Sequence, residues 1–232
     1  MLRVSNARGG YHTALIIRDI SVEIGEGEMV ALLGRNGVGK STLLKYIMGL
    51  VVAKGGDVEF DGRKLPASPA KRARAGLGYI PQGRHVFPRL TVSENIRVAA
   101  AACGKDETRT VKEILYKFPI LSARPNLLAE ALSGGQQQIL AIARALATGA
   151  KMLLLDEPTE GVQPSIVDDI EEILKSLNRD HGIAMLLAEQ NLDFAMSLTD
   201  RAYIMDKGTI AHSTGRDELL ADKRLLHELL GV

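Results

Sequence analysis

Three short segments of this sequence carry residue types that bind phosphate and activate water. The first, Gly34–Ser41 (GRNGVGKS), has the spacing G-x-x-x-x-G-K-[ST] and follows the apolar run Met29–Leu33. Glycines at this spacing let successive main-chain N–H groups point inward at phosphate oxygens, and the start of the following helix adds partial positive charge. Lys40 supplies a full charge to the outer phosphates, and the Ser41 hydroxyl is a ligand for Mg²⁺. The segment predicts a nucleotide-phosphate site.

The second segment, Met152–Glu157, is an apolar run that ends in two carboxylates. A buried strand that ends in this way places Asp156 near a phosphate-bound metal ion, through a water, and leaves Glu157 to polarise an attacking water. Many buried strands run into acidic turns, so this pattern alone has little specificity. Its combination with an upstream phosphate loop predicts a site that hydrolyses a nucleotide.

The third segment, Ser133–Gln136 (SGGQ), forms a turn at the start of the helical stretch Gln136–Leu146. A Ser-Gly-Gly turn at a helix N-terminus aims main-chain N–H groups at an anion. A site built from one chain already has its phosphate cradle in the first segment. The second cradle therefore predicts contact with the γ-phosphate of a nucleotide that is held mainly by another chain.

Two kinds of element must position these segments. Helical patterns such as Ser165–Asn178, behind Pro164, alternate with short apolar runs, and this alternation predicts an α/β fold. Strand signals vanish between Leu90 and Thr148, where Thr91–Glu94 has the spacing of a capping box, so a helical subdomain is expected there. The apolar runs have the composition of strands buried on both faces of a parallel sheet, and they are Met29–Leu33, Leu77–Ile80, Met152–Leu155, Ile183–Ala188 and Ala202–Met205.

Two peripheral segments are also predicted from local pattern. Pro66–Pro69, with the following basic residues Lys71, Arg72 and Arg74, is expected to be a surface loop that enters a short helix. The tail Asp217–Leu230 has the spacing of an amphipathic helix that packs against the core.

Composition excludes several classes of protein. The chain has 232 residues, of which 46% are hydrophobic and 25% charged, as expected for an ordinary globular protein rather than a disordered one. The 29 basic and 28 acidic residues give a net charge of +1, so the chain lacks the electrostatic footprint of a nucleic-acid-binding protein. A single cysteine excludes an internal disulfide framework and a cysteine metal site. We see neither an apolar run long enough to span a bilayer nor a secretory signal in the first residues.

The three segments, in this order, resemble those of the ATPase subunits of ATP-binding-cassette (ABC) transporters. The resemblance extends over essentially all 232 residues and implies a single ABC ATPase domain. Its expected fold is an α/β P-loop NTPase core with a mainly parallel sheet, an N-terminal antiparallel β region and an inserted α-helical subdomain. The implied boundaries are 1–87 and 149–216 for the core, 88–148 for the helical subdomain with the signature turn, and 217–232 for a C-terminal helix.

The resemblance also assigns residues outside the three segments. Gln82 matches the family's Q-loop, which contacts Mg²⁺ or the lytic water and links to the membrane subunits. Tyr11 lies where the family places an aromatic ring that stacks on adenine, although an ordinary strand-edge tyrosine is the alternative. The D-loop region here is Glu160–Gln163 (EGVQ), where many relatives carry Ser-Ala-Leu-Asp. This chain lacks the final aspartate, so the contacts that this aspartate makes across the dimer in relatives do not carry over to it.

The largest departure from the family is at the switch position. Relatives usually place a histidine after the strand Ile183–Ala188, and this chain has Gln190. A glutamine donates a hydrogen bond to the γ-phosphate but does not become cationic or shuttle a proton. Glu157 is therefore expected to carry the activation of water, in a single-base mechanism. The same Glu-Gln-Asn triplet is familiar from ATPases of branched-chain amino-acid uptake, and PTEGVQP is closest to their urea and short-chain-amide members.

These expectations define a full set of site residues. Catalytic roles fall to Glu157, Gln190 and Gln82, and metal contacts to Ser41, Gln82 and Asp156. The residues expected to bind ATP are Tyr11, Gly34, Arg35, Asn36, Gly37, Val38, Gly39, Lys40, Ser41, Thr42, Ser133, Gly134, Gly135 and Gln136.

The resemblance implies that the chain hydrolyses ATP with Mg²⁺ to power uptake of urea, amides or branched-chain amino acids. The implied partners are a second ABC ATPase chain, two transmembrane permease subunits and, indirectly, a periplasmic or surface substrate-binding protein. Nucleic acid is not expected as a partner. A related heterodimer partner is expected by resemblance, and a homodimer is left open by the residues. The implied location is peripheral, at the cytoplasmic face of the inner membrane.

Three other interpretations share some of these motifs: a non-transport ATPase that acts on DNA or ribosomes, an exporter, and a regulatory protein. A DNA-repair ATPase needs a long coiled coil between Lys40 and Ser133, where this chain has room only for a compact subdomain, and a ribosome-associated one usually joins two cassettes. An exporter of lipid or polysaccharide shares every core motif. A regulatory protein with a dead site is disfavoured because Lys40, Ser41, Asp156 and Glu157 are all present.

Overall fold

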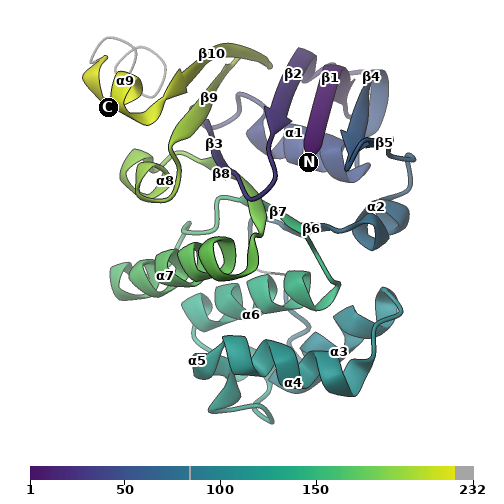
Figure 1. Ribbon diagram of the computed structural model, residues 1–232, viewed down its shortest axis with the longest axis vertical. Coiled ribbons are helices and arrows are strands. Elements are labelled where there is room, and N and C mark those ends of the chain that lie inside the picture. Colours follow the sequence, from purple (N-terminus) through teal and green to yellow (C-terminus); the bar gives the residue numbers. More distant parts are fainter. Residues whose placement is uncertain (84, 223–232) are drawn as a thin grey trace.

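Two β-sheets and a group of helices make up the structure, a computed structural model that describes residues 1–83 and 85–222 (Figure 1). The strands are β1 (Leu2–Gly10), β2 (Ile17–Ile24), β3 (Met29–Leu33), β4 (Val52–Phe60), β5 (Arg63–Lys64), β6 (Leu77–Ile80), β7 (Met152–Asp156), β8 (Ala184–Glu189), β9 (Arg201–Asp206) and β10 (Thr209–Gly215). The helices are α1 (Lys40–Met48), α2 (Pro69–Ala75), α3 (Val92–Ala102), α4 (Glu107–Lys117), α5 (Pro119–Ser122), α6 (Gly134–Ala147), α7 (Pro164–His181), α8 (Leu192–Leu198) and α9 (Arg216–Ala221), with a 3₁₀ turn, η1, at Ala129–Ala131.

The larger sheet carries the predicted parallel core. Within the described residues it has six strands in the order β10-β9-β3-β8-β7-β6, all parallel except β10 at one edge. Its five parallel strands coincide with the five apolar runs to within one residue at each end. The register pairs Leu33 with Glu189 and Asp156 with Ala188, so the carboxyl ends of β3, β8 and β7 lie side by side. The predicted phosphate loop and both carboxylates of Met152–Glu157 therefore emerge at one edge of the sheet.

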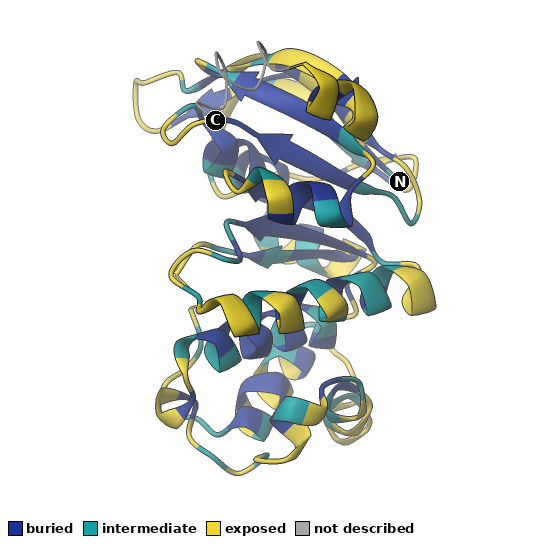
Figure 2. Ribbon diagram, turned by 90° about the vertical axis from the view of Figure 1, so that its left-hand side faces the viewer, coloured by how far each residue is buried: buried dark blue, intermediate teal, exposed yellow. Residues whose placement is uncertain are grey.

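The central strands of the large sheet are buried (Figure 2), and their side chains alternate between two cores, one on each face of the sheet. Ala31 and Leu33 join the core formed with α6, α7 and α8. Val30 and Leu32 join the second core, against α1 and the smaller sheet. This arrangement explains why the strands are continuous apolar runs, since both faces are covered.

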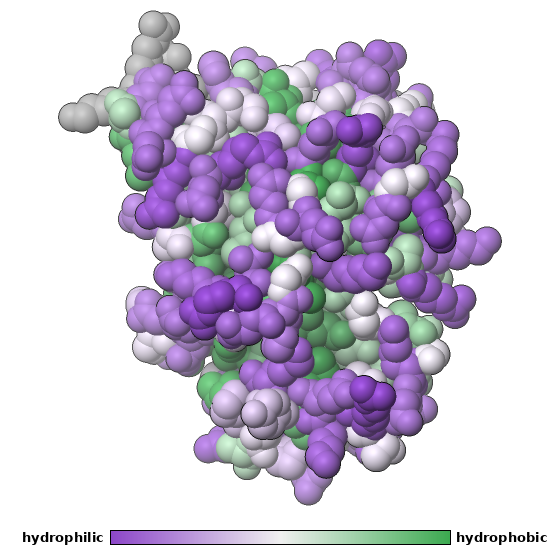
Figure 3. Space-filling view, in the orientation of Figure 1, coloured by the Kyte–Doolittle hydropathy of each residue, from purple (hydrophilic) through white to green (hydrophobic). Residues whose placement is uncertain are grey.

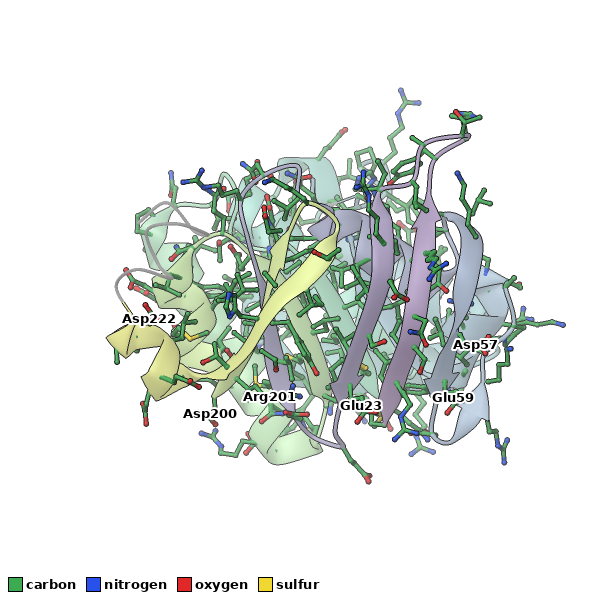
Figure 4. All side chains as sticks on the ribbon, turned by 90° about the horizontal axis from the view of Figure 1, so that it is seen from above. Glu23, Asp57, Glu59, Asp200, Arg201 and Asp222 are labelled. Carbon is green, nitrogen blue, oxygen red and sulfur yellow. The ribbon has the colours of Figure 1, made fainter. Side chains whose placement is uncertain are left out.

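The smaller sheet confirms the expected N-terminal antiparallel region. Its order is β2-β1-β4-β5 over the described residues, and all its pairs are antiparallel. It is tied to the larger sheet by Arg201 of β9, which lies near Glu23 of β2 (Figure 4) and whose guanidinium donates to the main-chain carbonyl of Glu23 at 2.9 Å. The same guanidinium pairs with Glu28 at 2.8 Å. The Tyr203 hydroxyl accepts a hydrogen bond from the Glu23 N–H at 3.1 Å.

Helices α3 to α6 form a separate layer below the sheet (Figure 1). They lie within the segment 88–148, where the sequence predicts a helical subdomain. Helix α3 begins as predicted, because the Thr91 hydroxyl accepts a hydrogen bond from the Glu94 N–H at 3.2 Å and the Glu94 carboxylate accepts one from the Thr91 N–H at 2.8 Å. Two main-chain N–H groups at the start of the helix, which have no partner within the helix, thereby form hydrogen bonds.

One residue expected on the surface is buried. Arg72 of α2 is only 7% exposed, and its guanidinium donates to the main-chain carbonyls of Pro66, Tyr46 and Ile47 at 2.6, 2.8 and 2.6 Å. Two of these carbonyls belong to the last turn of α1, where helix carbonyls lack partners within the helix. The prediction of a surface position was wrong for Arg72 because a basic residue near a loop gives no sign of such a cap.

The C-terminal helix begins one residue before the predicted boundary. Helix α9 covers Arg216–Ala221, and residues 223–232 of the predicted helix lie outside the described part of the chain.

Candidate functional site

The loop between β3 and α1 has the backbone that its glycines predict. Gly34 and Gly39 have φ angles of 152° and 113°, and both positions are also closely packed. A Cβ at Gly34 would lie 2.5 Å from the carbonyl oxygen of Met205, and one at Gly39 would lie 2.8 Å from the end of the Met205 side chain. Glycine is therefore required at both places by conformation, and at Gly34 also by space, because a main-chain atom lies in the way.

Lys40, the first residue of α1, is buried beneath this loop. Its side chain is 3% exposed, and its ammonium donates to the carbonyls of Gly34 at 2.8 Å and Arg35 at 3.3 Å. It also pairs with the Glu157 carboxylate, with an Nζ–Oε1 distance of 3.2 Å. The loop thus fixes the position of a full positive charge at the carboxyl edge of the sheet.

Ser41 and Asp156 meet at the end of β7. The Ser41 hydroxyl donates to Asp156 Oδ1 at 2.8 Å, and the Tyr79 hydroxyl donates to Oδ2 at 3.1 Å. Burial raises the pKa of the Asp156 carboxyl, and the hydrogen bonds from Ser41 and Tyr79 partly oppose this effect. Burial, with the nearby Asp156, also raises the pKa of Tyr79, which keeps its proton. The residues predicted at Ser41 and Asp156 are therefore in direct contact.

Glu157 lies at the junction of several predicted groups. It has a φ of 48°, unusual for a residue other than glycine, and its N–H donates to the Ala188 carbonyl of β8 at 2.9 Å. Such strained backbone is concentrated at functional sites. The Gln82 amide donates to Glu157 Oε2 at 3.3 Å and to Glu160 Oε2 at 2.6 Å. Glu157, Lys40 and Gln82 are thus brought together from three separate parts of the sequence.

These side chains line an open pocket of about 380 Å³. Tyr11 stands on its rim with 43% of its surface exposed. Gly34, Arg35 and Val38 shape the loop without lining the pocket, and Asp156 lies behind Ser41. The residues that line the pocket are Tyr11, Ile16, Asn36, Gly37, Gly39, Lys40, Ser41, Thr42, Gln82 and Glu157.

The Ser133–Gln136 turn lies outside this pocket, and hydrogen bonds between its own first and last residues stabilise it. The Ser133 hydroxyl accepts from the Gln136 N–H at 3.3 Å, and the Gln136 side chain accepts from the Ser133 N–H at 3.1 Å. Gly135 is buried, and a Cβ there would collide with the side chain of Ile166 in α7. The structure therefore gives Gly135 a packing role that the sequence pattern does not reveal.

Gln190 is likewise placed outside the pocket lining, in an exposed bend after β8. The residue before it, Glu189, is only 3% exposed and accepts hydrogen bonds from Thr159, Gln190 and Asn191. Burial raises the pKa of the Glu189 carboxyl, and these hydrogen bonds oppose the shift.

Sequence reasoning missed three site residues. They are Tyr79, Glu160 and Glu189, which contact Asp156, Gln82 and the loop after Glu157 respectively. The only signal in the sequence was their closeness to predicted site residues: Tyr79 lies three residues before Gln82, and Glu189 directly precedes Gln190.

Two further features of the described residues bear on the class of protein. These residues contain no group of three or more His, Cys, Asp or Glu side chains arranged to hold a metal ion by themselves. Every helix among them is too short or too polar to cross a membrane. A glycine loop, a buried lysine and a strand-end carboxylate at one edge of a parallel sheet define the phosphate-loop class of nucleotide-binding proteins.

Comparison with known proteins narrows this class. Residues 17–160 match the family described as ABC transporter. The chain is 39% identical to the high-affinity branched-chain amino acid transport ATP-binding protein BraG of Pseudomonas aeruginosa, over 100% of both chains. It is 35% identical to the lipopolysaccharide export system ATP-binding protein LptB of Haemophilus influenzae, over 100% of this chain and 97% of that one. A dimeric structure of the ATP-binding cassette MJ0796 in a post-hydrolysis state, bound to ADP and Pi, superposes with a TM-score of 0.81 at 26% identity, covering 93% of this chain and 99% of that one.

The chain belongs to the ABC transporter family. It binds nucleotide and is an ATPase whose hydrolysis of ATP is coupled to transport. The predicted resemblance to the branched-chain amino-acid uptake branch is confirmed by the relative from Pseudomonas and by a second one. The second is described as a probable branched-chain amino acid transport ATP-binding protein, LivF, of Archaeoglobus fulgidus, and is 36% identical over 100% of this chain and 99% of that one.

Proposed function

We propose that this chain is the ATP-hydrolysing subunit of an ABC importer for branched-chain amino acids or for urea and short amides. The observation that carries the proposal is the pocket in which Lys40 and Ser41 of the phosphate loop lie against Glu157 and Asp156. The full-length similarity to BraG supports import. The phrase Pro158–Pro164 (PTEGVQP) supports the urea and amide members of that branch.

In this proposal the pocket holds ATP by its phosphates and its base. Main-chain N–H groups of Asn36–Thr42 surround the phosphates, and Tyr11 stacks on adenine at the rim. The incoming phosphates replace Glu157 as the counter-ion of Lys40, since both are anionic and compete for one ammonium. ATP binding thus releases the Glu157 carboxylate from its ion pair.

The donor set around Ser41 fits Mg²⁺. A hydroxyl and a carboxylate lie 2.8 Å apart, and the amide of Gln82 belongs to the same pocket. Magnesium prefers such oxygen ligands, keeps several waters and relies on substrate phosphates, so a small protein contribution is sufficient. When bound, it would neutralise charge on the transferred phosphate. Ser41 would hold it directly, and Asp156 would hold it through water.

Glu157 then serves as the general base for hydrolysis. It accepts a proton from the water that attacks the γ-phosphate, and Gln82 orients that water through its amide. Gln190, which is exposed at the end of β8, donates a hydrogen bond to the γ-phosphate when the site is assembled.

A second ABC ATPase chain completes the site. The Ser133–Gln136 turn lies outside this chain's own pocket, and its N–H groups serve a nucleotide held by the partner. The dimeric assembly of MJ0796 with ADP and Pi supports a sandwich of this kind. We expect a related but different partner chain, with a homodimer as the alternative.

An apolar groove between the sheet and the helical layer receives the permease. It encloses about 550 Å³ and is bounded by α2, β6, α3 and α6. Figure 3 shows apolar side chains in the waist between these two layers. Phe87 and Val98 are each 42% exposed there, and Gln82 lies two residues from the groove residue Ile80. Two permease subunits, one for each ATPase chain, would dock here and place the chain peripherally on the cytoplasmic face of the inner membrane.

The base assignment is tested with Glu157→Gln. This variant keeps the side-chain size and introduces an amide NH₂ that donates to the phosphate, but it does not accept the water's proton. We expect single-turnover hydrolysis to fall by about a hundredfold or more while ATP still binds. Asp193→Asn, on α8, is the matched control and should hydrolyse ATP at the wild-type rate. Undiminished hydrolysis by Glu157→Gln would show that another group is the base.

Transport assays separate the substrate classes. Vesicles from strains with and without this chain are supplied with labelled urea or leucine, and loss of uptake of one of them identifies the class. Loss of neither supports a second candidate function, ATPase of an exporter of lipid or polysaccharide, which the 35% identity to LptB favours. Co-purified permease subunits would identify that system.

A further inference from the structure

One buried carboxylate has no part in the mechanism described so far. Glu189 is the last residue of β8, is 3% exposed, and accepts four hydrogen bonds. A buried carboxylate with four donors is costly to desolvate and is retained only where the surrounding structure satisfies it fully.

The two carboxylate oxygens serve two different loops. Oε1 accepts from the Thr159 hydroxyl at 2.8 Å and from the Thr159 N–H at 3.4 Å, in the loop that follows Glu157. Oε2 accepts from the N–H groups of Gln190 and Asn191 at 3.1 and 3.2 Å, in the bend that carries the switch glutamine. A single rigid group therefore joins two loops that are 30 residues apart in sequence.

The sheet places this junction directly behind the pocket. Glu189 pairs in register with Leu33, the residue before the phosphate loop, and the preceding residue, Ala188, pairs with Asp156. The Ala188 carbonyl also accepts a hydrogen bond from the N–H of Glu157. The backbone of the base, the backbone of the switch bend and the start of the phosphate loop thus share one short stretch of β8.

We infer that Glu189 is a positioning residue for hydrolysis, which holds the loop of Glu157 and the bend of Gln190 in one fixed relation. This inference rests on the proposed function of the pocket. Without the carboxylate, each loop keeps its own turn, but Glu157 and Gln190 are no longer held in a fixed position relative to each other. Small displacements of positioned groups reduce the rate of the chemical step more than they reduce binding.

Three substitutions separate the two sides of the junction. Thr159→Val keeps the shape but removes the hydroxyl donor to Oε1, whereas Thr159→Ser retains that donor. Glu189→Gln replaces one oxygen with an amide NH₂, which does not accept from an N–H, so one loop loses its acceptor. Thr199→Val is the matched control, because Thr199 is 1% exposed and its hydroxyl donates to the Ala195 carbonyl in α8, away from the junction.

The experiment measures Mg²⁺·ATP binding and single-turnover hydrolysis on the full chain. We expect Thr159→Val to hydrolyse about tenfold more slowly with ATP affinity within about twofold, and Thr159→Ser and Thr199→Val to match wild type. Glu189→Gln should be at least as slow as Thr159→Val, and the double variant no slower than Glu189→Gln, because both act on one junction. A merely structural role would lower binding and rate together, and would affect Thr199→Val equally.

Two results overturn the inference. One is hydrolysis by Thr159→Val at the rate of Thr199→Val; the other is an equal loss for Thr159→Val and Thr159→Ser. If Glu157→Gln is inactive in the same series, the proposed function stands and only the role of Glu189 fails. If wild type itself hydrolyses no ATP, the proposed function fails and this inference fails with it.

Discussion

The phosphate loop and the Ser133–Gln136 turn are two versions of one device, a glycine turn that opens a helix. Around the loop, other parts of the same chain have gathered: Lys40 contacts Glu157, and Ser41 contacts Asp156. Around the turn, the contacts are its own capping box and the packing of Gly135 against Ile166. The loop therefore meets its proposed catalytic partners within one chain, whereas the turn lies outside the pocket. This difference supports the proposal that the turn serves a nucleotide held by a second chain.

The strongest test of this difference is Lys40→Ala. Removal of the ammonium leaves the phosphates without their buried counter-charge, so we expect ATP binding by the isolated chain to be lost and hydrolysis to fall by about a hundredfold or more. Calorimetric titration with ATP and phosphate release measure the two effects. Lys71→Met, on the exposed face of α2, is the control and should leave both unchanged. Tight ATP binding by Lys40→Ala would contradict the hypothesis that the phosphate loop is the main phosphate-binding site.

Ser133→Ala should show the opposite pattern. We expect ATP affinity of the isolated chain to stay within about twofold, and hydrolysis by the assembled transporter to fall about tenfold, since we propose that this turn serves the partner's nucleotide. The substitution also removes a helix cap worth about 1 kcal/mol. Thr91→Ala removes the same kind of capping box from α3 and is the matched control. An equal loss of activity in both variants would mean that Ser133 acts only as a cap.

The same contrast explains what the sequence predicted and what it did not. The phosphate loop and the strands of the large sheet were predicted closely, because glycine spacing and fully apolar runs are local signals with one structural solution. The contacts of Glu189 with Thr159 and of Arg72 with α1 were not predicted. They depend on the register between β7 and β8 and on how α2 docks, and no local pattern encodes either. The assignments of Ser133–Gln136 and Gln190 stay predictions, because both segments lie outside the pocket lining and their proposed ligand is a nucleotide phosphate.

The helices behind the two devices also end differently, which predicts a difference in stability. The last turn of α1 is held by the buried Arg72, whereas α6 ends at Thr148 with a hydroxyl contact to its own Ala145. Arg72→Met should lower the free energy of unfolding by about 2 to 3 kcal/mol, because three carbonyls lose a charged donor. The exposed Arg74→Met should change it by less than about 0.5 kcal/mol. Denaturant titration measures the change in unfolding free energy for both variants. Equal changes would show that Arg72 does not cap α1.

The smallest expected effect concerns pH, and it belongs to the phosphate-loop region, because both buried carboxylates among the described residues, Asp156 and Glu189, lie behind it. Burial raises the pKa of Glu189 in the folded chain, so between its unfolded value, about 4.3 for a free glutamate, and its folded value the native state binds more protons than the unfolded state. Its contribution to stability is therefore fully present below the unfolded pKa and is lost as pH rises through the folded pKa. Glu189→Gln does not titrate, so the unfolding free energy of wild type minus that of Glu189→Gln should fall as pH rises from the unfolded pKa through the folded pKa. Denaturant titrations of both proteins across this range measure the difference, and a value that rises with pH would mean that the four hydrogen bonds outweigh burial and hold the carboxylate ionised.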